Sequence, residues 1–361
     1  MKLLAALALT ACATASAAAP KWHQLETYTF EQYLVDFNKQ YPVSGLASRR
    51  SLFDKQLQSV RQHNAGTSTY KQGVNKFTDM TPSEFQMHKG AKRSARPMSI
   101  NEISHNELLQ TIKAGDYADE IDWRKEGVTT PVKNQGGCGS CWAFSGTEVL
   151  ETHVAIQTGK LIEMAPQEFV SCMPNPDECG GTGGCEGATQ WLLFDYAAQN
   201  GMTTEESYPY TARDSQCKTP EPVANITGYV RLPTNDYDAL MAATQLSSVA
   251  ITVSASWGAY ESGVFNDVDA CGFELDHGVV VEGYGTDSTS GEEYWLVRNS
   301  WGTSWGEDGY IRLLRNGEDT VGTDTNPADG VACKPYPETQ EVKGICGMLS
   351  DSSYATGGYL L

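Results

Sequence analysis

The cysteines constrain this chain more than any other residue type. Ten are present in 361 residues, and the first, Cys12, lies in a segment typical of a secretory signal peptide. That segment has a positive start, a short apolar run and small residues before Pro20, which predicts cleavage after Ala17, Ala18 or Ala19. The alternative is an uncleaved membrane anchor, but the apolar run is too short to span a bilayer.

Nine cysteines remain after such a cleavage. Cysteines of a secreted chain normally form disulfides, so an odd number leaves one thiol free or paired between molecules. This leftover thiol is the first indication of a functional cysteine. No later segment reaches transmembrane length, so the sequence predicts a soluble mature protein without a membrane partner.

Charge is distributed unevenly along the chain. The net charge is −19, yet residues 20–116 carry thirteen Lys and Arg against nine Asp and Glu. Residues 117–361 carry twelve against thirty-six. A weakly basic leader could be attracted to this acidic body, although a solvated acidic surface explains the body equally well. Either interpretation argues against nucleic acid as a partner.

The sequence patterns predict an α+β protein. Residues 26–64 have helical spacing, with Pro42 to Gly45 expected to separate two helices, and residues 90–116 are polar, aperiodic and expected to be a cleavable linker. A helix is expected after Cys141, ending at Gly159. Apolar runs bounded by turn residues predict four strands, at 249–253, 279–281, 294–297 and 310–314. The body is therefore expected to be helix-rich first and sheet-rich second, with a core supported by an apolar fraction of 40%.

Cys141 lies where a thiol can become nucleophilic. It directly precedes the predicted helix, and the positive end of a helix dipole favours the reactive thiolate. Cys138, three residues earlier, could be its redox partner or half of a structural disulfide. The redox interpretation requires a thioredoxin-like βαβ context, which the surrounding sequence lacks.

A thiolate needs a histidine partner, and the body contains only His153 and His277. His153 lies twelve residues along the same predicted helix, about 18 Å from Cys141, and cannot reach it. His277 stands at the entry to an apolar strand and is the remaining candidate. Asn299 directly follows another strand and could orient the imidazole, although by position alone it could equally be a turn residue.

Several motifs resemble the papain and cathepsin L family. The segment Gln135 to Ser145 resembles the family's nucleophile segment, Asp276-His277-Gly278 its histidine segment, and Asn299-Ser-Trp-Gly302 its asparagine segment. They occur in the family's order, and Asp122-Trp-Arg and Val132-Lys-Asn-Gln match upstream. The resemblance runs from residue 119 to the C-terminus. It implies a papain-like two-lobed fold, with a helical left lobe, a β-barrel-like right lobe and an active-site cleft between them.

The resemblance also implies a role for each matched residue. Cys141 would attack the scissile carbonyl, and His277 would form an ion pair with it and later protonate the leaving amine. Asn299 would orient His277 beneath the indole of Trp301. The side-chain amide of Gln135 and the backbone N–H of Cys141 would hold the oxyanion, where loss of one donor typically costs about 10²–10³ in rate.

The leader resembles the family's inhibitory propeptide. Residues 73–79 match its Gly-x-Asn-x-Phe-x-Asp motif fully, whereas the longer helical motif departs at Gly45 and Gln56, where Glu and Asn are usual. The departure at Gly45 is expected to weaken one buried salt link. The resulting domain prediction is a signal peptide at 1–19, an inhibitory propeptide at 20–116 and a papain-like peptidase domain at 117–361.

By resemblance, three disulfides join Cys138 to Cys185, Cys172 to Cys217 and Cys271 to Cys346. Two cysteines then remain, each in a segment that looks like an insertion relative to papain: one within 174–184 and one within 316–343. We expect a fourth disulfide between them, Cys179–Cys333, the alternative being two unpaired or separately capped thiols. Parity favours the disulfide, although eight cysteines allow 105 pairings.

The resemblance places substrate-binding residues at Gly187, Ala188, Asp276, Trp301 and Asp351. Ala188 replaces a glycine whose backbone contacts the substrate residue two before the cut, so some adjustment is expected. A carboxylate from Asp351 at the floor of that pocket could pair with Arg or Lys as well as tolerate apolar side chains, which predicts a dual preference. The alternative is that Asp351 points to solvent.

The sequence thus favours a zymogen of a secreted or lysosomal/vacuolar cysteine endopeptidase. Expected partners are polypeptide substrates, the chain's own propeptide and cystatin-type inhibitors, on a monomer without cofactor or metal. Asn225-Ile-Thr is an N-glycosylation acceptor. Two other classes compete, a catalytically silent binding protein of the same fold and a thiol–disulfide oxidoreductase using Cys138 and Cys141. No histidine loop that would block the cleft is visible, which favours an endopeptidase, and transpeptidation stays open.

Overall fold

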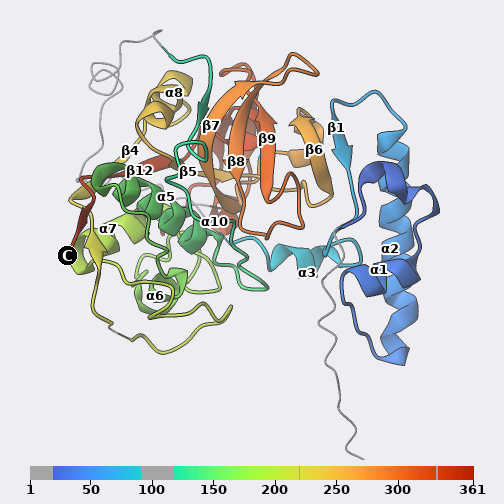
Figure 1. The fold of residues 1–361 in the computed structure, drawn as a ribbon, viewed down its shortest axis with the longest axis horizontal. Coiled ribbons are helices and arrows are strands. Elements are labelled where there is room, and N and C mark those ends of the chain that lie inside the picture. The colour runs from blue at the N-terminus through green and yellow to red at the C-terminus, as the bar shows by residue number, and fades with distance from the viewer. Residues whose placement is uncertain (1–18, 91–116, 219, 331) are drawn as a thin grey trace, which may run out of the picture.

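The computed structural model describes residues 19–90, 117–218, 220–330 and 332–361. We call residues 20–90 the leader and residues 117–361 the body. Figure 1 shows the leader helices packed at one side of the body, with the short helix α3 (Pro82–Gln86) between the two. The predicted signal peptide, except residue 19, and the predicted linker, except residue 90, lie outside the described residues.

The leader forms a small helical unit with its own core. It contains η1 (Trp22–Thr27), α1 (Phe30–Asp36) and α2 (Val43–Asn64), which confirms the helical prediction for this region. Their apolar side chains pack together in one buried cluster. The expected break between the helices was placed wrongly. Because Pro42 is the N-cap of α2, Gly45 belongs to the first turn of that helix rather than to the linker.

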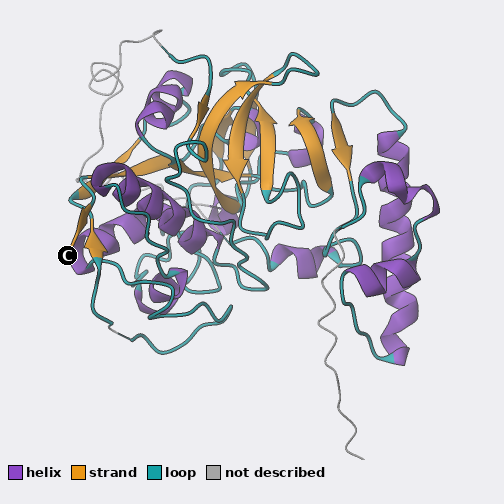
Figure 2. Ribbon diagram, in the orientation of Figure 1, coloured by secondary structure: helices purple, strands orange, loops and turns teal. Residues whose placement is uncertain are grey.

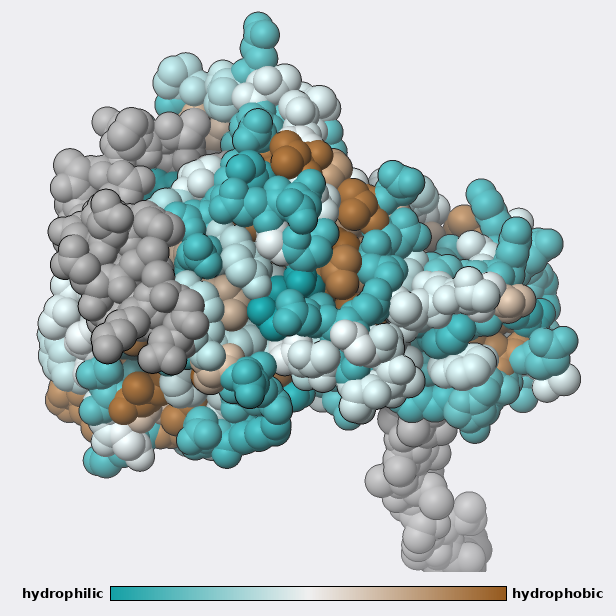
Figure 3. All heavy atoms as spheres, turned by 90° about the horizontal axis from the view of Figure 1, so that it is seen from above, coloured by the Kyte–Doolittle hydropathy of each residue, from teal (hydrophilic) through white to brown (hydrophobic). Residues whose placement is uncertain are grey.

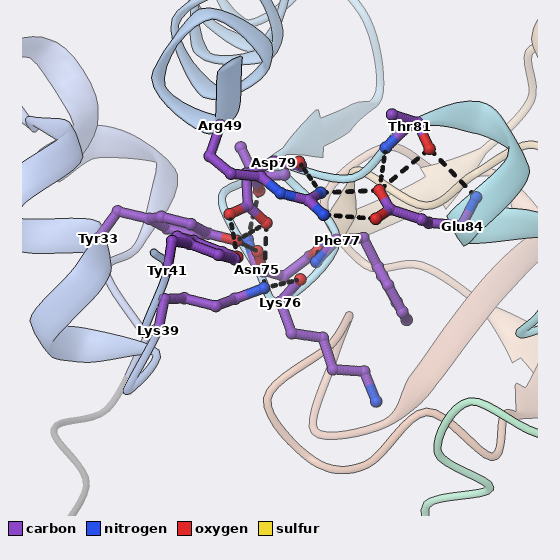
Figure 4. A network of polar contacts seen from close by, with 11 residues as sticks. Tyr33, Lys39, Tyr41, Arg49, Asn75, Lys76, Phe77, Asp79, Thr81 and Glu84 are labelled. Atoms are coloured by element: carbon purple, nitrogen blue, oxygen red, sulfur yellow. Dashed lines mark hydrogen bonds and ion pairs between the residues drawn. The ribbon is translucent and has the colours of Figure 1, made fainter. Parts of the chain in front are cut away.

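Asp79 anchors the leader core through a buried polar network (Figure 4). Its carboxylate accepts hydrogen bonds from the hydroxyls of Tyr33 at 2.9 Å and Tyr41 at 2.5 Å, and pairs with Lys39 at 3.0 Å. Gly45 has no carboxylate to form the salt link that the family usually has at this position, and another acidic residue of the network forms an ion pair instead. Arg49 pairs with Glu84, which Thr81 at the start of α3 also contacts, and the hydrogen bond from Arg49 lowers the pKa of Glu84 to about 2.

The helical lobe of the body is built around one long buried helix. This helix, α5 (Cys141–Thr158), begins at Cys141 and ends at Gly159, whose φ of 71° gives the left-handed C-cap that glycine favours. Helices α6 (Pro166–Cys172) and α7 (Gln190–Asn200) pack against it. Both predicted ends of α5 are therefore confirmed.

The sheet lobe contains a nine-stranded sheet to which the leader adds one strand. Its order is β1-β6-β9-β8-β7-β5-β12-β4, with β2 paired to β7, so the sheet has two ends and does not close into a barrel. Figure 2 shows β6 to β9 side by side in one part of the body, whereas β4 and β12 extend toward the helices near the C-terminus. All four predicted strands are present. The bounds are β1 (Tyr70–Gln72), β2 (Ile121–Asp122), β4 (Gly228–Arg231), β5 (Val249–Val253), β6 (Tyr260–Phe265), β7 (His277–Thr286), β8 (Glu293–Arg298), β9 (Tyr310–Leu314) and β12 (Ser352–Thr356).

Shorter elements complete the body around these two lobes. The helices are α8 (Tyr237–Leu246), α9 (Val268–Cys271), α10 (Pro327–Gly330) and η2 (Ile345–Gly347). Strands β10 (Val321–Asp324) and β11 (Gln340–Lys343) form one hairpin, and β3 (Ala224–Asn225) pairs with β13 (Tyr359–Leu360). One core runs through both lobes, since α5 packs directly against β7.

The structure contains the four expected disulfides. They join Cys138 to Cys185, Cys172 to Cys217, Cys179 to Cys333 and Cys271 to Cys346. Among the described residues, Cys141 is the free cysteine. Because Cys138 is bonded to Cys185, the structure argues against a redox pair formed by Cys138 and Cys141.

The outer surface is mainly hydrophilic on the face seen in Figure 3, where brown side chains form small separate patches. Within the described ranges, no helix combines the length and the apolar character needed to cross a bilayer.

Candidate active site

Three elements bring the candidate catalytic residues to one place. Cys141 opens α5, His277 opens β7, and Asn299 follows the last residue of β8. Because β7 and β8 are antiparallel neighbours, the start of β7 lies beside the end of β8. The amide of Gly278 donates to the Cys141 sulfur at 3.3 Å, so the thiol lies directly at the start of β7.

The hydrogen bonds define the state of His277. Asn299 Oδ1 accepts from the backbone amide of Ser300 at 2.8 Å, which identifies this atom as the oxygen of the side-chain amide. His277 Nε2 lies 2.8 Å from the same oxygen and must therefore donate its proton. In the neutral ring, Nδ1 is then left with its lone pair, and it has no partner among the described residues.

An aromatic ring and a side-chain amide pack around His277 and Asn299. The indole of Trp301 stacks on His277 with ring centres 4.7 Å apart. Ser300 donates its hydroxyl to Gln135 Oε1 at 2.6 Å, and Gln135 Nε2 donates to the carbonyl of Cys138 at 2.9 Å. The amide of Gln135 is therefore fixed beside the turn that leads into Cys141, with a second N–H available.

Burial keeps both reactive groups neutral. Cys141 and His277 are fully buried. Desolvation raises the pKa of the Cys141 thiol to about 12, although the backbone amides of Gly278, Trp142 and Gly90 act to lower it. Desolvation also lowers the pKa of His277 to about 3, against the hydrogen bond to Asn299. With the leader in place, the site therefore holds a thiol and a neutral imidazole.

Three leader residues, His88 to Gly90, cover the site. The carbonyl of His88 accepts from the Trp301 indole at 3.0 Å, and Lys89 pairs with Asp276 at 2.8 Å. Gly90 donates to the Asp276 carbonyl at 3.0 Å and accepts from the Ala188 amide at 3.2 Å. A Cβ on Gly90 would lie 2.1 Å from the Gly139 carbonyl oxygen, so the segment fits closely only because this residue is glycine.

The expected substrate-binding residues divide into two groups. One group lies against the leader segment 88–90 and consists of Gly187, Ala188, Asp276 and Trp301. Gly187 approaches it so closely that an added Cβ would be 2.6 Å from the Gly90 oxygen. Among the described residues, no hydrogen bond or ion pair joins Asp351 to this segment. Its carboxylate accepts from the Thr252 hydroxyl at 3.0 Å and lies 3.7 Å from the Arg231 guanidinium.

The environment of Asp351 changes the expectation for this residue. Asp351 is 8% exposed, so the alternative that it points to solvent is wrong. The pairing with Arg231 already compensates the negative charge that was expected to attract a basic substrate side chain.

A buried ionic cluster behind the site was not foreseen from the sequence. Arg298, fully buried, lies 3.2 Å from Glu148 without hydrogen-bond alignment and donates to Glu282 at 3.1 Å. Glu148 is on α5, Glu282 on β7, and Arg298 directly precedes Asn299, so the cluster joins the elements that carry the three candidate residues. The sequence signal was present as charged residues inside otherwise apolar stretches.

The remaining sites are not part of this arrangement. His153 is buried in α5, where desolvation lowers its pKa to about 4, and its ring nitrogens have no partner within the described residues. Asn225 lies in β3 at the edge of the body, and Thr227 of the same acceptor triplet is exposed. Across the described chain, no group of three or more His, Cys, Asp or Glu is arranged to hold a metal ion.

Comparison with known proteins identifies the family. Residues 117–331 match the model of the papain family cysteine proteases, and residues 30–85 match the cathepsin propeptide inhibitor domain. Procathepsin L of Rattus norvegicus is 35% identical over 326 residues, covering 87% of this chain and 95% of that protein. A senescence-specific cysteine protease of Oryza sativa subsp. japonica is 34% identical over 332 residues, covering 90% and 89%.

Solved precursors have the same fold. The recombinant stem bromelain precursor superposes with a TM-score of 0.74 at 32% identity, covering 91% of this chain and 97% of that one. A digestive procathepsin L2 proteinase from the larval midgut of Tenebrio molitor also gives 0.74 at 32% identity, covering 90% and 98%. The chain belongs to the papain family of cysteine proteases and carries a cathepsin-type propeptide inhibitor domain.

Proposed function

We propose that the mature protein is an endopeptidase of the secretory pathway that cuts peptide bonds with Cys141 as nucleophile and His277 as its acid–base partner. The supporting observation is the hydrogen bond from His277 to Asn299, which leaves Nδ1 as the only ring nitrogen able to take the thiol proton. The position of Cys141 at the start of α5 supports the same role, because the helix dipole stabilises a thiolate there.

In the proposed reaction, the thiol proton moves to His277 Nδ1 and the thiolate attacks the scissile carbonyl carbon. The tetrahedral oxyanion is held by the free N–H of Gln135 and the backbone N–H of Cys141. The imidazolium then protonates the leaving amine as the C–N bond breaks, which leaves a thioester. A water molecule, deprotonated by His277, hydrolyses the thioester to a carboxylic acid and restores the thiol.

The leader would act as an intramolecular inhibitor until it is removed. Strand β1 of the leader pairs with β6 of the body, and Phe77 and Phe85 pack edge-on against Trp301. These contacts hold His88 to Gly90 over Cys141, where a substrate backbone would have to lie.

We place the processing site in the segment 91–116 and the mature chain at 117–361, and expect a monomer that cystatin-type inhibitors could bind. We assign the protein to a lysosome-like vacuole or the extracellular space.

The direct test is to express the precursor, acidify it and follow hydrolysis of a peptide reporter. We expect activity to appear as the leader is cut, and Cys141→Ala to abolish it while leaving the thermal melting temperature near that of the wild type. An epoxide inhibitor that requires the ion pair should label wild type alone. An active Cys141→Ala variant, or a wild type without hydrolysis or label after leader removal, would contradict the proposal. The second result would favour the silent binding protein.

Replacing Gly90 by alanine should produce a leaking precursor. The added methyl group would meet the backbone of Gly139 at 2.1 Å, so the leader segment must lift from the site. We expect activity of the uncleaved chain at neutral pH to rise at least about tenfold, equivalent to about 1.4 kcal/mol of lost leader binding. The mature enzyme should be unchanged, since Gly90 has then been removed.

The matched control for this experiment is Gly45→Ala. A Cβ on Gly45, in leader helix α2, would meet nothing closer than 3.8 Å, and alanine is the better helix former. This variant should stay as inactive as the wild-type precursor. Equal activities of the two variants would show that the contact with Gly139 does not control inhibition.

Asp351→Ala separates the two halves of the expected substrate preference. If Arg231 neutralises Asp351, the variant should change the ratio of Phe-Arg to Arg-Arg reporter cleavage by less than about twofold. A collapse of Arg-Arg cleavage alone would restore the dual preference expected from the sequence.

Glycosylation of Asn225 is tested on the same preparations by the mass lost on enzymatic deglycosylation, with Asn225→Gln as the blank.

A further inference from the structure

One disulfide differs from the other three in what it connects. Cys138–Cys185 and Cys172–Cys217 lie within the helical lobe, the latter joining the last residue of α6 to a loop, and Cys271–Cys346 joins two segments of the sheet lobe. Cys179 lies between α6 and α7, whereas Cys333 lies beyond β9, 154 residues later. The bond Cys179–Cys333 therefore ties the two lobes together.

Backbone contacts surround this bond and make it a built connection. The amide of Gly180 donates to the Ala332 carbonyl at 3.2 Å, and the amide of Lys334 donates to the Asp177 carbonyl at 3.0 Å. Both cysteines are 2% exposed. We call the contacts of residues 177–180 with Ala332, Cys333 and Lys334 the cross-lobe bridge.

The sheet-lobe end of the bridge leads to the segment that carries the candidate base. From Cys333 the chain continues into β11, whose Val342 is buried against Leu275 and Phe273. Glu274 in the same segment accepts from the Thr325 hydroxyl at 2.6 Å. This segment continues directly into Asp276 and His277.

The helical-lobe end of the bridge supports the opposite wall of the site. A Cβ on Gly187 would lie 2.4 Å from the Gly180 oxygen and 2.6 Å from the Gly90 oxygen. The amide of Gly183 also donates to the Gly187 carbonyl at 2.9 Å. Gly187 is thus in close contact both with Gly180 of the cross-lobe bridge and with Gly90 of the leader segment that covers Cys141.

We propose that the cross-lobe bridge is a specificity-determining feature of this protease, which fixes the separation between the Gly187–Ala188 wall and the Asp276 side of the site. The inference rests on the proposed function, since the same walls would hold the substrate. A fixed separation sets the width of the pocket for the side chain two residues before the cut. Without the bridge, the loop 174–184 keeps the hydrogen bond from the Tyr336 hydroxyl to the Glu178 carbonyl at 3.4 Å but loses its covalent tie to the sheet lobe. The wall can then move, and selection by side-chain size weakens.

The test removes the disulfide of the bridge without leaving a free thiol, by the double substitution Cys179→Ala/Cys333→Ala in the full precursor. After activation, kcat/KM is measured for reporters that carry Phe, Leu or Val two residues before the cut, normalised by active-site titration. We expect the ratio between the best and the worst reporter to fall about fivefold or more, since one methylene group in a shaped pocket is worth about 10–200-fold. The matched control, Cys172→Ala/Cys217→Ala, removes a disulfide within the helical lobe and should leave the ratio unchanged.

A second variant covers the case in which the double substitution does not fold. Glu274→Ala keeps the disulfide but loosens its anchor at Thr325 and Asn326, and should shift the ratio in the same direction by a smaller factor. An unchanged ratio in whichever bridge variant yields titratable enzyme would show that the bridge only stabilises the fold and would overturn the inference. A wild-type enzyme that hydrolyses none of the reporters would instead overturn the proposed function.

Discussion

Replacing Arg298 by methionine is expected to lower the free energy of unfolding by about 3–5 kcal/mol, because removal of one partner leaves buried charges without compensation. Arg298 is fully buried between the carboxylates of Glu148 and Glu282, which are 1% and 0% exposed. Methionine fills part of the same space without charge, so the loss would report the stranded carboxylates together with the hydrogen bonds that Arg298 donates to Pro131 and Thr130. For a body of this size the melting temperature should fall by about 10 °C or more.

The loss of unfolding free energy in Arg298→Met should grow as the pH rises. Burial already raises the pKa of Glu148 to about 7, whereas the unfolded carboxyl titrates near pH 4.3. When a group has a higher pKa in the folded state than in the unfolded state, the free energy of unfolding falls as the pH rises from the unfolded pKa to the folded pKa. Without the lowering influence of Arg298, this loss extends to higher pH. We therefore expect a larger difference from wild type at pH 8 than at pH 4.5, measured by thermal unfolding of the precursor.

Two further variants make the result specific. Lys125→Met breaks an exposed pair with Glu120 and should change stability by less than about 0.5 kcal/mol. The double variant Arg298→Met/Glu148→Gln removes one of the stranded carboxylates and should recover part of the loss at pH 8. If Arg298→Met and Lys125→Met have the same melting temperature at pH 8, the buried ionic cluster does not stabilise the packing of α5 against β7.

The sequence predicted the positions of elements whose ends depend on local signals. Gly159 marks the C-terminal end of α5, because a glycine in the left-handed conformation ends a helix locally. The apolar run after His277 likewise predicted β7. These local signals brought the candidate nucleophile and base to element ends, where a reactive side chain can meet its partner.

Features that need distant partners could not be read from one sequence. Arg231 and Asp351 are 120 residues apart, and nothing along the chain indicates that strands β4 and β12 place them side by side. The same holds for Arg298 with Glu148, and for β1 of the leader, which joins a sheet otherwise built from the body. The break before α2 was misplaced for a different reason, since Pro42 limits the helix start more strongly than Gly45 limits its interior.

Alkylation of Cys141 should separate the closed precursor from the mature enzyme by about three orders of magnitude or more. The thiolate is the form that reacts, and desolvation by burial raises the pKa of Cys141 in the precursor to about 12. Between pH 5 and pH 8 the precursor thiol therefore carries almost no charge and reacts very slowly with iodoacetamide. Its rate should climb about tenfold per pH unit, as expected for a titration far below the pKa.

Removal of the leader should change both the rate and the shape of this profile. Water then reaches the site, the desolvation that suppresses both charges is relieved, and a thiolate at a helix start beside an imidazolium has a pKa in the range of about 3.5–7.5. The mature enzyme should react quickly with a rate that is nearly flat from pH 5 to pH 8. Intact-mass measurement distinguishes label on the uncleaved chain from label on the processed one.

The Gly90→Ala precursor adds an intermediate case to the same experiment. If lifting the leader segment is sufficient to charge the thiol, this variant should be alkylated faster than the wild-type precursor at every pH, while Cys141→Ser stays unlabelled. A wild-type precursor that reacts as fast as the mature enzyme would mean that the ion pair already exists beneath the leader. Inhibition would then come only from blocked access, and the neutral state inferred for Cys141 and His277 would be wrong.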